Sequence, residues 1–197
     1  MEYNEPLINK VFPRDGYYET LVGTSGIETK VKPIGVIKKS ILLIMKLYQG
    51  TLTLSNIIKY PFCTINITSD IPVFYYSILG NIQYNIEYGL PYIPDAFIIF
   101  CRCEIVSDGD PVEVKVIPFH FMGEPRKSIN RGELILLDIL VNITRLNIYS
   151  GIEKDKLINI INYEIGVVKK TSPWLLSIID QALKRYGYTI NDKITTL

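Results

Sequence analysis

Residues 41–59 read ILLIMKLYQGTLTLSNIIK, and the change of pattern inside this stretch is the main guide to the fold. The first part, Ile41 to Tyr48, is almost wholly apolar and short, which is typical of a buried strand. Gln49-Gly50 interrupts the run, and Thr51 to Lys59 then opens with hydroxyl side chains of the kind that cap helices. The stretch therefore predicts a buried strand that turns directly into a short capped helix.

Strand signals surround this stretch on both sides. Short segments rich in β-branched and aromatic residues alternate with turn residues. Ser25-Gly26 joins the first two segments into a hairpin, and a turn with Asp-Gly at its centre, residues 107–111, joins the last two. Residues 69–94, rich in Pro, Gly and Tyr, predict an irregular connection with one short helix. The predicted strands are 17–24, 27–37, 41–48, 62–68, 95–106 and 112–121.

The sequence changes character at Pro125, after which helical patterns replace strand patterns. The helical segments are 130–147, about 154–169 and 173–186. The last begins with a cap residue and Pro173 at its first helical position, and Gly187 stands where a helix C-cap belongs. Strands followed by helices predict an α+β protein, with a small β-barrel in residues 1–124 and a three-helix unit in residues 125–197.

Composition and charge exclude several classes of protein. Of the 197 residues 48% are hydrophobic, so the chain can bury a core, and a net charge of +1 argues against a general nucleic-acid binder. The longest uncharged run, residues 71–86, is shorter than the ~20 apolar residues of a membrane span. The N-terminus, Met1 to Glu5, is acidic and unlike a secretory signal. We therefore expect a cytoplasmic protein that binds neither nucleic acid nor membrane.

Few residues point to metal or nucleophilic chemistry. Cys101 and Cys103 share one face of a predicted strand, and we interpret them as small core residues rather than as half of a metal site. His120 is the only histidine, and no nucleophile motif accompanies it. The glycine-rich phosphate motifs of dinucleotide-binding and P-loop proteins are absent from the sequence. We expect no metal site.

Two segments have the composition of a ligand site. Gly50, Thr51 and Thr53 offer close backbone approach, hydroxyl groups and the free N–H groups of a helix start, as a phosphate requires. The same residues also fit an ordinary strand-to-helix turn with a cap. In Lys32-Pro33-Ile34-Gly35-Val36, Gly35 leaves room for a flat ring against the strand or marks a bulge. Both interpretations of each segment remain open at this stage.

These segments belong to an ordered set of motifs that resembles a known family over roughly residues 17–186. The set is similar to that of domain-of-unknown-function family four-four-seven, a largely archaeal group of FMN-binding split barrels related to flavin reductases. The last two motifs look like helical signatures of that family. The motifs are Glu19-Thr20-Leu21-Val22, Lys32-Pro33-Ile34-Gly35-Val36, Tyr48-x-Gly50-Thr51-x-Thr53-x-x-Asn56, Asn66-Ile67-Thr68-x-Asp70-x-Pro72, Asn130-Arg131-Gly132 and Thr144-Arg145.

The resemblance implies a flavin-reductase-like split β-barrel that binds FMN, in a homodimer with the cofactor at the subunit interface. The phosphate would meet Thr51, Thr53 and the backbone near Gly50. The ring would lie beside the Ile34–Val36 strand, with Asn66 as a polar partner. The cofactor-binding residues expected in this way are Lys32, Pro33, Ile34, Gly35, Val36, Gly50, Thr51, Thr53, Asn56, Asn66 and Arg131.

The chain departs from the family pattern at two positions. Leu52 stands where a basic residue is expected, and Asn142 stands where a histidine is common. The first removes a cation for the phosphate, and the second leaves an acid–base role at that position in doubt.

The helix predicted over residues 130–147 carries its polar side chains on one face. Arg131, Asp138, Asn142 and Arg145 follow at intervals of seven, four and three residues. This pattern is typical of a solvated stripe, and it equally fits a polar wall that faces a cofactor or substrate, with Arg131 neutralising an anion.

The motifs leave the activity open. One hypothesis is an FMN-dependent oxidoreductase of the flavin-reductase-like type that acts on an unknown small cytoplasmic substrate. A second is a non-catalytic FMN-binding carrier or regulatory dimer, and a third is a structural dimer whose barrel has lost the flavin. No residue is assigned as a catalytic acid or base, because the flavin itself would carry the electron transfer.

Overall fold

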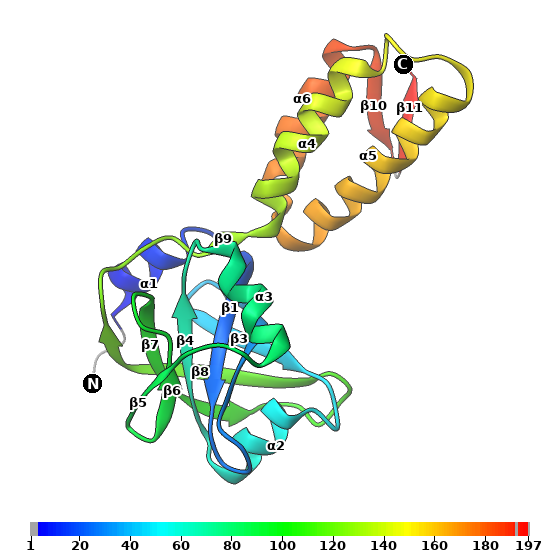
Figure 1. Cartoon of the computed structure of the whole chain (residues 1–197). Coiled ribbons are helices and arrows are strands. Elements are labelled where there is room, and N and C mark those ends of the chain that lie inside the picture. Colours follow the sequence, from blue (N-terminus) through cyan, green and yellow to red (C-terminus); the bar gives the residue numbers. More distant parts are fainter. Residues whose placement is uncertain (1–3, 192, 197) are drawn as a thin grey trace. The chain divides into compact units, whose positions relative to one another are not determined.

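The computed structural model describes residues 4–191 and 193–196 and divides into two compact units (Figure 1). The first unit ends at Ile129 and the second begins at Asn130, whereas the change of pattern in the sequence lies at residue 125. The residues in between stay with the first unit because the Ser128 N–H donates to the carbonyl of Val11 at 2.9 Å. The Ser128 hydroxyl also donates to the carbonyl of Glu19 at 3.2 Å.

The first unit is built around an antiparallel β-barrel. Its strands follow one another in the order β2-β3-β8-β7-β4-β1, and β1 also pairs with β2, which closes the ring. The short β9 (Ile129–Asn130) lies next to β1. The α+β fold with a small barrel predicted from the sequence is therefore confirmed. The barrel strands are β1 (Gly16–Thr24), β2 (Lys30–Lys39), β3 (Leu42–Leu47), β4 (Phe62–Ile67), β7 (Phe97–Ile105) and β8 (Val112–Met122).

Side chains along the strands alternate between the barrel interior and its outer face, as the pleat requires. In β3, Leu43, Met45 and Leu47 are buried, whereas Leu42 and Lys46 are exposed. The alternation decides which side chains of each strand fill the core and which are free to line a site on the outside.

The three cysteines lie in the barrel core, as the sequence predicts for Cys101 and Cys103. Cys63 and Cys101 are fully buried and Cys103 nearly so, and the sulfur atoms of Cys63 and Cys103 are 3.4 Å apart. Hydrogen bonding between the thiols, together with burial, raises the pKa of Cys63 and Cys103 well above the ordinary value. Thiols that stay protonated are poor nucleophiles. Among the described residues, no group of three His, Cys, Asp or Glu side chains could hold a metal ion.

Three helices and a small hairpin complete the first unit. The sequence does not anticipate α1 (Glu5–Val11), whose Ile8 and Val11 are fully buried in the barrel core. The predicted capped helix is α2 (Leu52–Lys59). The connection predicted to be irregular contains the expected short helix and, in addition, a hairpin: α3 (Ile71–Leu79), β5 (Asn85–Glu87) and β6 (Leu90–Tyr92).

The second unit contains the three predicted helices and one addition. Its core is formed between α4, α5 and α6, and the chain's single tryptophan, Trp174, packs against it. Gly187 has a φ of +86° and follows α6, as the sequence predicts for a C-cap. A hairpin that the sequence does not anticipate follows. The elements are α4 (Arg131–Arg145), α5 (Gly151–Thr171), the 3₁₀ turn η1 (Pro173–Leu175), α6 (Leu176–Arg185), β10 (Tyr188–Asn191) and β11 (Lys193–Thr196).

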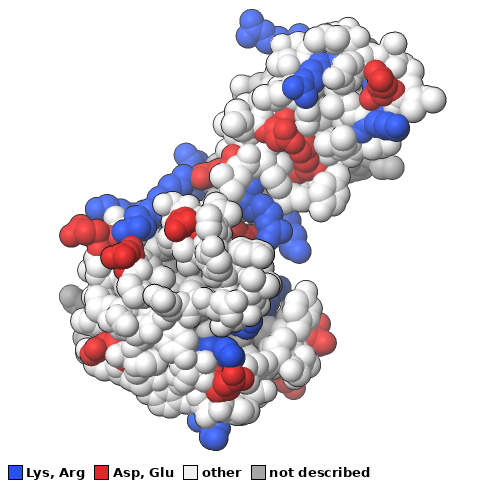
Figure 2. All heavy atoms as spheres, viewed as in Figure 1, with Lys and Arg blue, Asp and Glu red and all other residues white. Residues whose placement is uncertain are grey.

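The surface carries charges of both signs. On the face that Figure 2 shows, Lys and Arg residues are interspersed with Asp and Glu residues, and wide areas carry neither. This distribution agrees with the net charge of +1. Within residues 4–191 and 193–196, no helix is long and apolar enough to cross a membrane.

Candidate functional site

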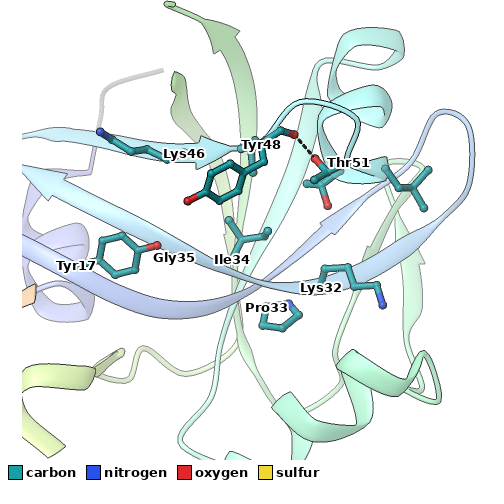
Figure 3. A pocket seen from close by; sticks show the side chains of 11 residues that line it. Tyr17, Lys32, Pro33, Ile34, Gly35, Lys46, Tyr48 and Thr51 are labelled. Atoms are coloured by element: carbon teal, nitrogen blue, oxygen red, sulfur yellow. Dashed lines mark hydrogen bonds between the residues drawn. The ribbon is translucent and has the colours of Figure 1, made fainter. Parts of the chain in front are cut away.

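A pocket of about 500 Å³ opens in the first unit where β2, β3 and the start of α2 meet (Figure 3). Six of the residues that the sequence and the family resemblance single out line it: Lys32, Pro33, Ile34, Gly35, Thr51 and Thr53. Tyr48 and Leu52, which the sequence analysis names in the motif of this segment without assigning them to the site, also line the pocket. The sequence analysis does not identify the remaining three, Tyr17, Lys46 and Leu47.

The pairing of β2 with β3 brings the two halves of the pocket together. Val36 lies opposite Met45 in this antiparallel pair, so Gly35 and Lys46 stand at the same level of the sheet. Beyond this level the chain continues through Tyr48 into α2, while β2 runs back toward Lys32. The pocket therefore extends from the start of α2 along both strands.

One end of the pocket presents hydrogen-bond donors. Thr51 is the N-cap of α2, and its hydroxyl accepts the Leu54 N–H at 3.4 Å and donates to the Tyr48 carbonyl at 2.8 Å. The N–H groups of Leu52 and Thr53 belong to the first turn, which has no partners for them inside the helix. Gly50 makes the turn with a φ of +74°, a conformation that favours glycine.

Thr53 is the most informative residue at this end. The residue is only 6% exposed and lines the pocket, and its hydroxyl makes no hydrogen bond with any described residue. An unpaired hydroxyl in a pocket wall is available to donate to a ligand. A hydroxyl and two helix N–H groups in one place form a donor set suited to an anion.

Lys32 adds a positive charge at the same end. Its ammonium group donates to the carbonyls of Ser77 and Ile78, at 3.2 and 3.3 Å, in the last turn of α3. A cation at a helix C-terminus is favourable because the carbonyl ends carry partial negative charge. An ammonium group has three N–H donors, so one remains for a ligand in the pocket.

Gly35 is needed because an aromatic ring lies against it. A Cβ atom at this position would come within 2.0 to 2.1 Å of the Tyr17 ring and hydroxyl. The pairing of β1 with β2 runs through Glu19 and Gly35 without a register shift, so the glycine does not mark a bulge. One flat ring that lies against this glycine is that of Tyr17 (Figure 3).

Asn56 lies outside the pocket lining and makes its hydrogen bonds within the protein. Its Oδ1 accepts the N–H groups of Ile27 and Glu28 at 2.8 and 3.2 Å. Its Nδ2 donates to the Thr24 hydroxyl at 3.0 Å and to the Glu28 carbonyl at 2.7 Å. With these partners the amide holds the turn between β1 and β2.

Asn66 is likewise fully buried and outside the pocket lining. Its Nδ2 donates to the Leu21 carbonyl at 2.9 Å and to the Thr64 hydroxyl at 3.0 Å, and its Oδ1 accepts the Ile93 N–H at 2.8 Å. The side chain therefore joins β1, β4 and the loop after β6, and no polar atom is left over for a ligand.

The remaining three expected residues are placed as follows. The Val36 side chain is fully buried in the barrel core. Gly50 belongs to the turn before the pocket's donor end. Arg131 is the first residue of α4 in the second unit, whereas every residue of the pocket lining belongs to the first.

The polar face of α4 is directed partly toward α5. Asn142 is only 6% exposed and, with Asp138, interacts with the carboxyl group of Glu164 on α5. Burial of Glu164, followed by its hydrogen bond and repulsion with Asp138, raises the pKa of Glu164 to about 7. Its Oε2 is buried without a hydrogen-bond partner. A solvated stripe therefore does not describe this part of the face, although Arg131 and Arg145 are exposed.

This carboxyl pair should make the second unit less stable as the pH rises. Folded Glu164 binds a proton between pH 4.5 and about 7 that the unfolded chain releases, so the free energy of unfolding falls across this range and is level above it. We expect a loss of roughly 1–3 kcal/mol between pH 5 and pH 8. Urea unfolding followed by Trp174 fluorescence measures it.

Two variants check the assignment. Glu164→Gln removes the titrating group and should abolish most of the pH dependence, whereas Glu153→Gln, at an exposed position on the same helix, should leave it intact. An unchanged pH dependence in Glu164→Gln would show that another group is responsible.

Solved structures with some likeness to this chain include three flavin-related proteins. An FMN-bound protein from Methanosarcina mazei superposes with a TM-score of 0.50 at 19% identity, covering 88% of this chain and 94% of that one. An NADH:FAD oxidoreductase from Streptomyces globisporus gives 0.49 at 13% identity, with 58% and 74% covered. The flavin reductase PheA2 gives 0.45 at 19% identity, with 58% and 82% covered. At 19% identity the likeness to the first of these structures concerns the fold alone.

The sequence also matches a protein family, although no curated protein matches it. The N-terminal domain of the family described as protein of unknown function, DUF447, matches residues 18–122. A second part of the same family description matches residues 130–175. The two matches cover most of the chain, and each lies within one of its two structural units. The chain belongs to the DUF447 family of proteins of unknown function.

Proposed function

We propose that this protein is an FMN-binding flavoprotein and that the pocket between β2, β3 and α2 is its cofactor site. The observation that carries the proposal is the unpaired hydroxyl of Thr53, a residue only 6% exposed, beside the free N–H groups of α2 at one end of an otherwise largely apolar pocket. The fold shared with an FMN-bound member of the same family supports it. A volume of about 500 Å³ is in the range of small-molecule sites.

The donor end would hold the phosphate group. The Thr53 hydroxyl and the first N–H groups of α2 supply hydrogen bonds to its oxygens, which are strong because the acceptor is charged. Leu52 stands where the family pattern has a basic residue. Lys32, which lines the same pocket, would supply the missing positive charge. Thr51 contributes by holding the first turn of α2 in place through its cap.

The remaining walls would hold the ring system. Ile34 forms an apolar surface, and the aromatic rings of Tyr17 and Tyr48 border the space above it (Figure 3). Tyr48 is 64% exposed, so a planar ligand that packed against it would shield an aromatic surface from water. The phosphate would thus meet hydrogen-bond donors and a positive charge, and the flat ring would meet apolar and aromatic side chains.

We propose further that the protein is a flavin-dependent oxidoreductase of the flavin-reductase-like type. FMN supplies hydride-transfer chemistry when it is bound, and the chain's own residues bind and orient it. The reaction would pass a hydride, two electrons and one proton, from NADH or NADPH to FMN, and then from FMN to a small acceptor. No side chain in the pocket is required as an acid or base for the first transfer.

The experiment that tests the proposal begins with the cofactor. Protein purified without added flavin, or incubated with FMN, should absorb as a flavoprotein, and the molecule released on denaturation should have the mass of FMN. Bleaching of the flavin band by NADH or NADPH without oxygen would support the oxidoreductase. Bleaching by dithionite alone would favour a carrier or regulatory protein, and a chain that binds no FMN would contradict both.

We propose finally that the protein is a homodimer whose second copy covers the cofactor. The pocket rim is exposed at Tyr48, and α3 presents uncovered apolar side chains, among them Ile71, Tyr75 and Ile78. Exposed apolar surface of this kind is typical of protein interfaces. Sedimentation equilibrium should give twice the mass of the chain, and a monomer at micromolar concentration would contradict the assembly.

A further inference from the structure

Lys46 lies at the far end of the pocket from the start of α2. Figure 3 shows Lys46 and Lys32 at opposite ends of the pocket, with Ile34 and Gly35 between them. Lys46 extends from the outer face of β3, since Met45 and Leu47 on either side point into the core. The pocket thus has two cations, one beside the anion-binding helix and one beside Tyr17 and Gly35.

Lys46 has a single acidic partner among the described ion pairs. Its ammonium nitrogen is 3.0 Å from a carboxylate oxygen of Glu113 on the neighbouring strand β8, and both side chains are partly exposed. An exposed pair of this kind is held weakly. The ammonium group is therefore able to turn toward a charge that develops in the pocket.

We propose that Lys46 sets the reduction potential of the bound flavin. The inference rests on the proposed function, because it requires FMN to lie with its phosphate at α2. The ring then extends along β2 and β3 toward Gly35 and Lys46, the only direction in which the pocket lining continues among the described residues. Lys46 is therefore the cation at the end of the pocket that the flavin ring would occupy.

The two lysines differ in what they do when the flavin is reduced. Reduction adds two electrons and, in the anionic reduced form, one proton at N5, which leaves negative charge around N1 and the C2 carbonyl. The phosphate carries the same charge before and after. Lys32 therefore favours both redox states equally, whereas Lys46 favours the reduced state.

A role of Lys46 in the potential can be told from a purely structural role by comparing the affinities for reduced and oxidised FMN. In Lys46→Met we expect the affinity for reduced FMN to fall about tenfold more than the affinity for oxidised FMN. For a two-electron couple this corresponds to a potential lower by about 30 mV. In Lys32→Met both affinities should fall together, and the potential should stay that of the wild type.

The experiment is an anaerobic titration of the FMN-loaded full chain with dithionite as electron source and a reference dye in equilibrium. Lys46→Arg keeps the charge and should keep the potential. Glu113→Gln removes the counter-ion and should raise the potential. Lys115→Met, on β8 and outside the pocket lining, controls for the loss of any surface charge and should leave the potential unchanged.

The outcomes separate the two proposals. If the wild-type chain does not bind FMN, measured by quenching of flavin fluorescence, both proposals fail. If it binds FMN and both Lys46→Met and Glu113→Gln keep the wild-type potential, the role of Lys46 is refuted and the cofactor site stands. The role of Lys46 is also refuted, and the cofactor site again stands, if Lys115→Met lowers the potential as much as Lys46→Met does.

Discussion

Replacing Thr53 by Val should weaken FMN binding by roughly 10- to 150-fold, the value of one hydrogen bond to a charged group, about 1.5–3 kcal/mol. Thr53 lines the pocket and its hydroxyl has no partner among the described residues, so its removal leaves the protein's own hydrogen bonds intact. Valine keeps the shape of threonine, and the fold should be undisturbed. Titration of FMN followed by flavin fluorescence gives the dissociation constant.

Two further variants make this result specific. Adding Thr51→Ala should weaken binding more, although part of that effect comes from the lost helix cap, worth about 1 kcal/mol of stability. Ser55→Ala is a matched control, because Ser55 also carries a hydroxyl on α2 but does not line the pocket. Equal affinities for FMN in Thr53→Val and the wild type would show that the phosphate does not bind at the start of α2.

Replacing Gly23 by Ala should destabilise the barrel by about 3–5 kcal/mol, through overpacking and a disturbed buried hydrogen bond. A Cβ atom here would lie 2.1 Å from the Pro91 carbonyl oxygen and 2.4 Å from the Thr64 hydroxyl. These two atoms are hydrogen-bonded to each other, and Gly23 is paired with Val31 and Thr64 on its two sides. Little can therefore move aside.

Urea unfolding followed by far-ultraviolet circular dichroism measures this loss as a lower midpoint. Gly109→Ala is the control, since its Cβ would meet its nearest neighbour at an ordinary 3.6 Å. A wild-type midpoint in Gly23→Ala would mean that β6 is free to shift away from β1.

The sequence predicts elements whose signals are local. The apolar run before Gly50 and the hydroxyl residues after it are enough to place β3 and α2, because a buried strand and a capped helix each have a pattern of their own. The shorter α1 is missed, although Asn4 accepts the Leu7 N–H as a cap and Glu5 stands in the first turn. That cap is the signal that could have revealed it.

The site is predicted less completely, because contacts between distant residues define it. Tyr17 and Lys46 enter the pocket only because β1, β2 and β3 pair in one register, which no local pattern reveals. Asn56 and Asn66 match family motifs, yet their partners are backbone groups 27 to 45 residues away and the hydroxyls of Thr24 and Thr64. An amide that binds a cofactor and one that holds a turn look the same in a sequence.

The ammonium group of Lys32 makes occupancy of the pocket and order in α3 mutually dependent. Two of its three N–H groups serve the last carbonyls of that helix, and the third is available to an anion beside them. An anion that accepts the third N–H holds the ammonium group where it meets Ser77 and Ile78, so binding orders the end of α3. Coupling of this kind is reciprocal, and disorder at that end must weaken binding by the same factor. Amide exchange at Gly80 and Asn81, whose N–H groups close the helix on Ser77 and Tyr76, would then follow ligand concentration.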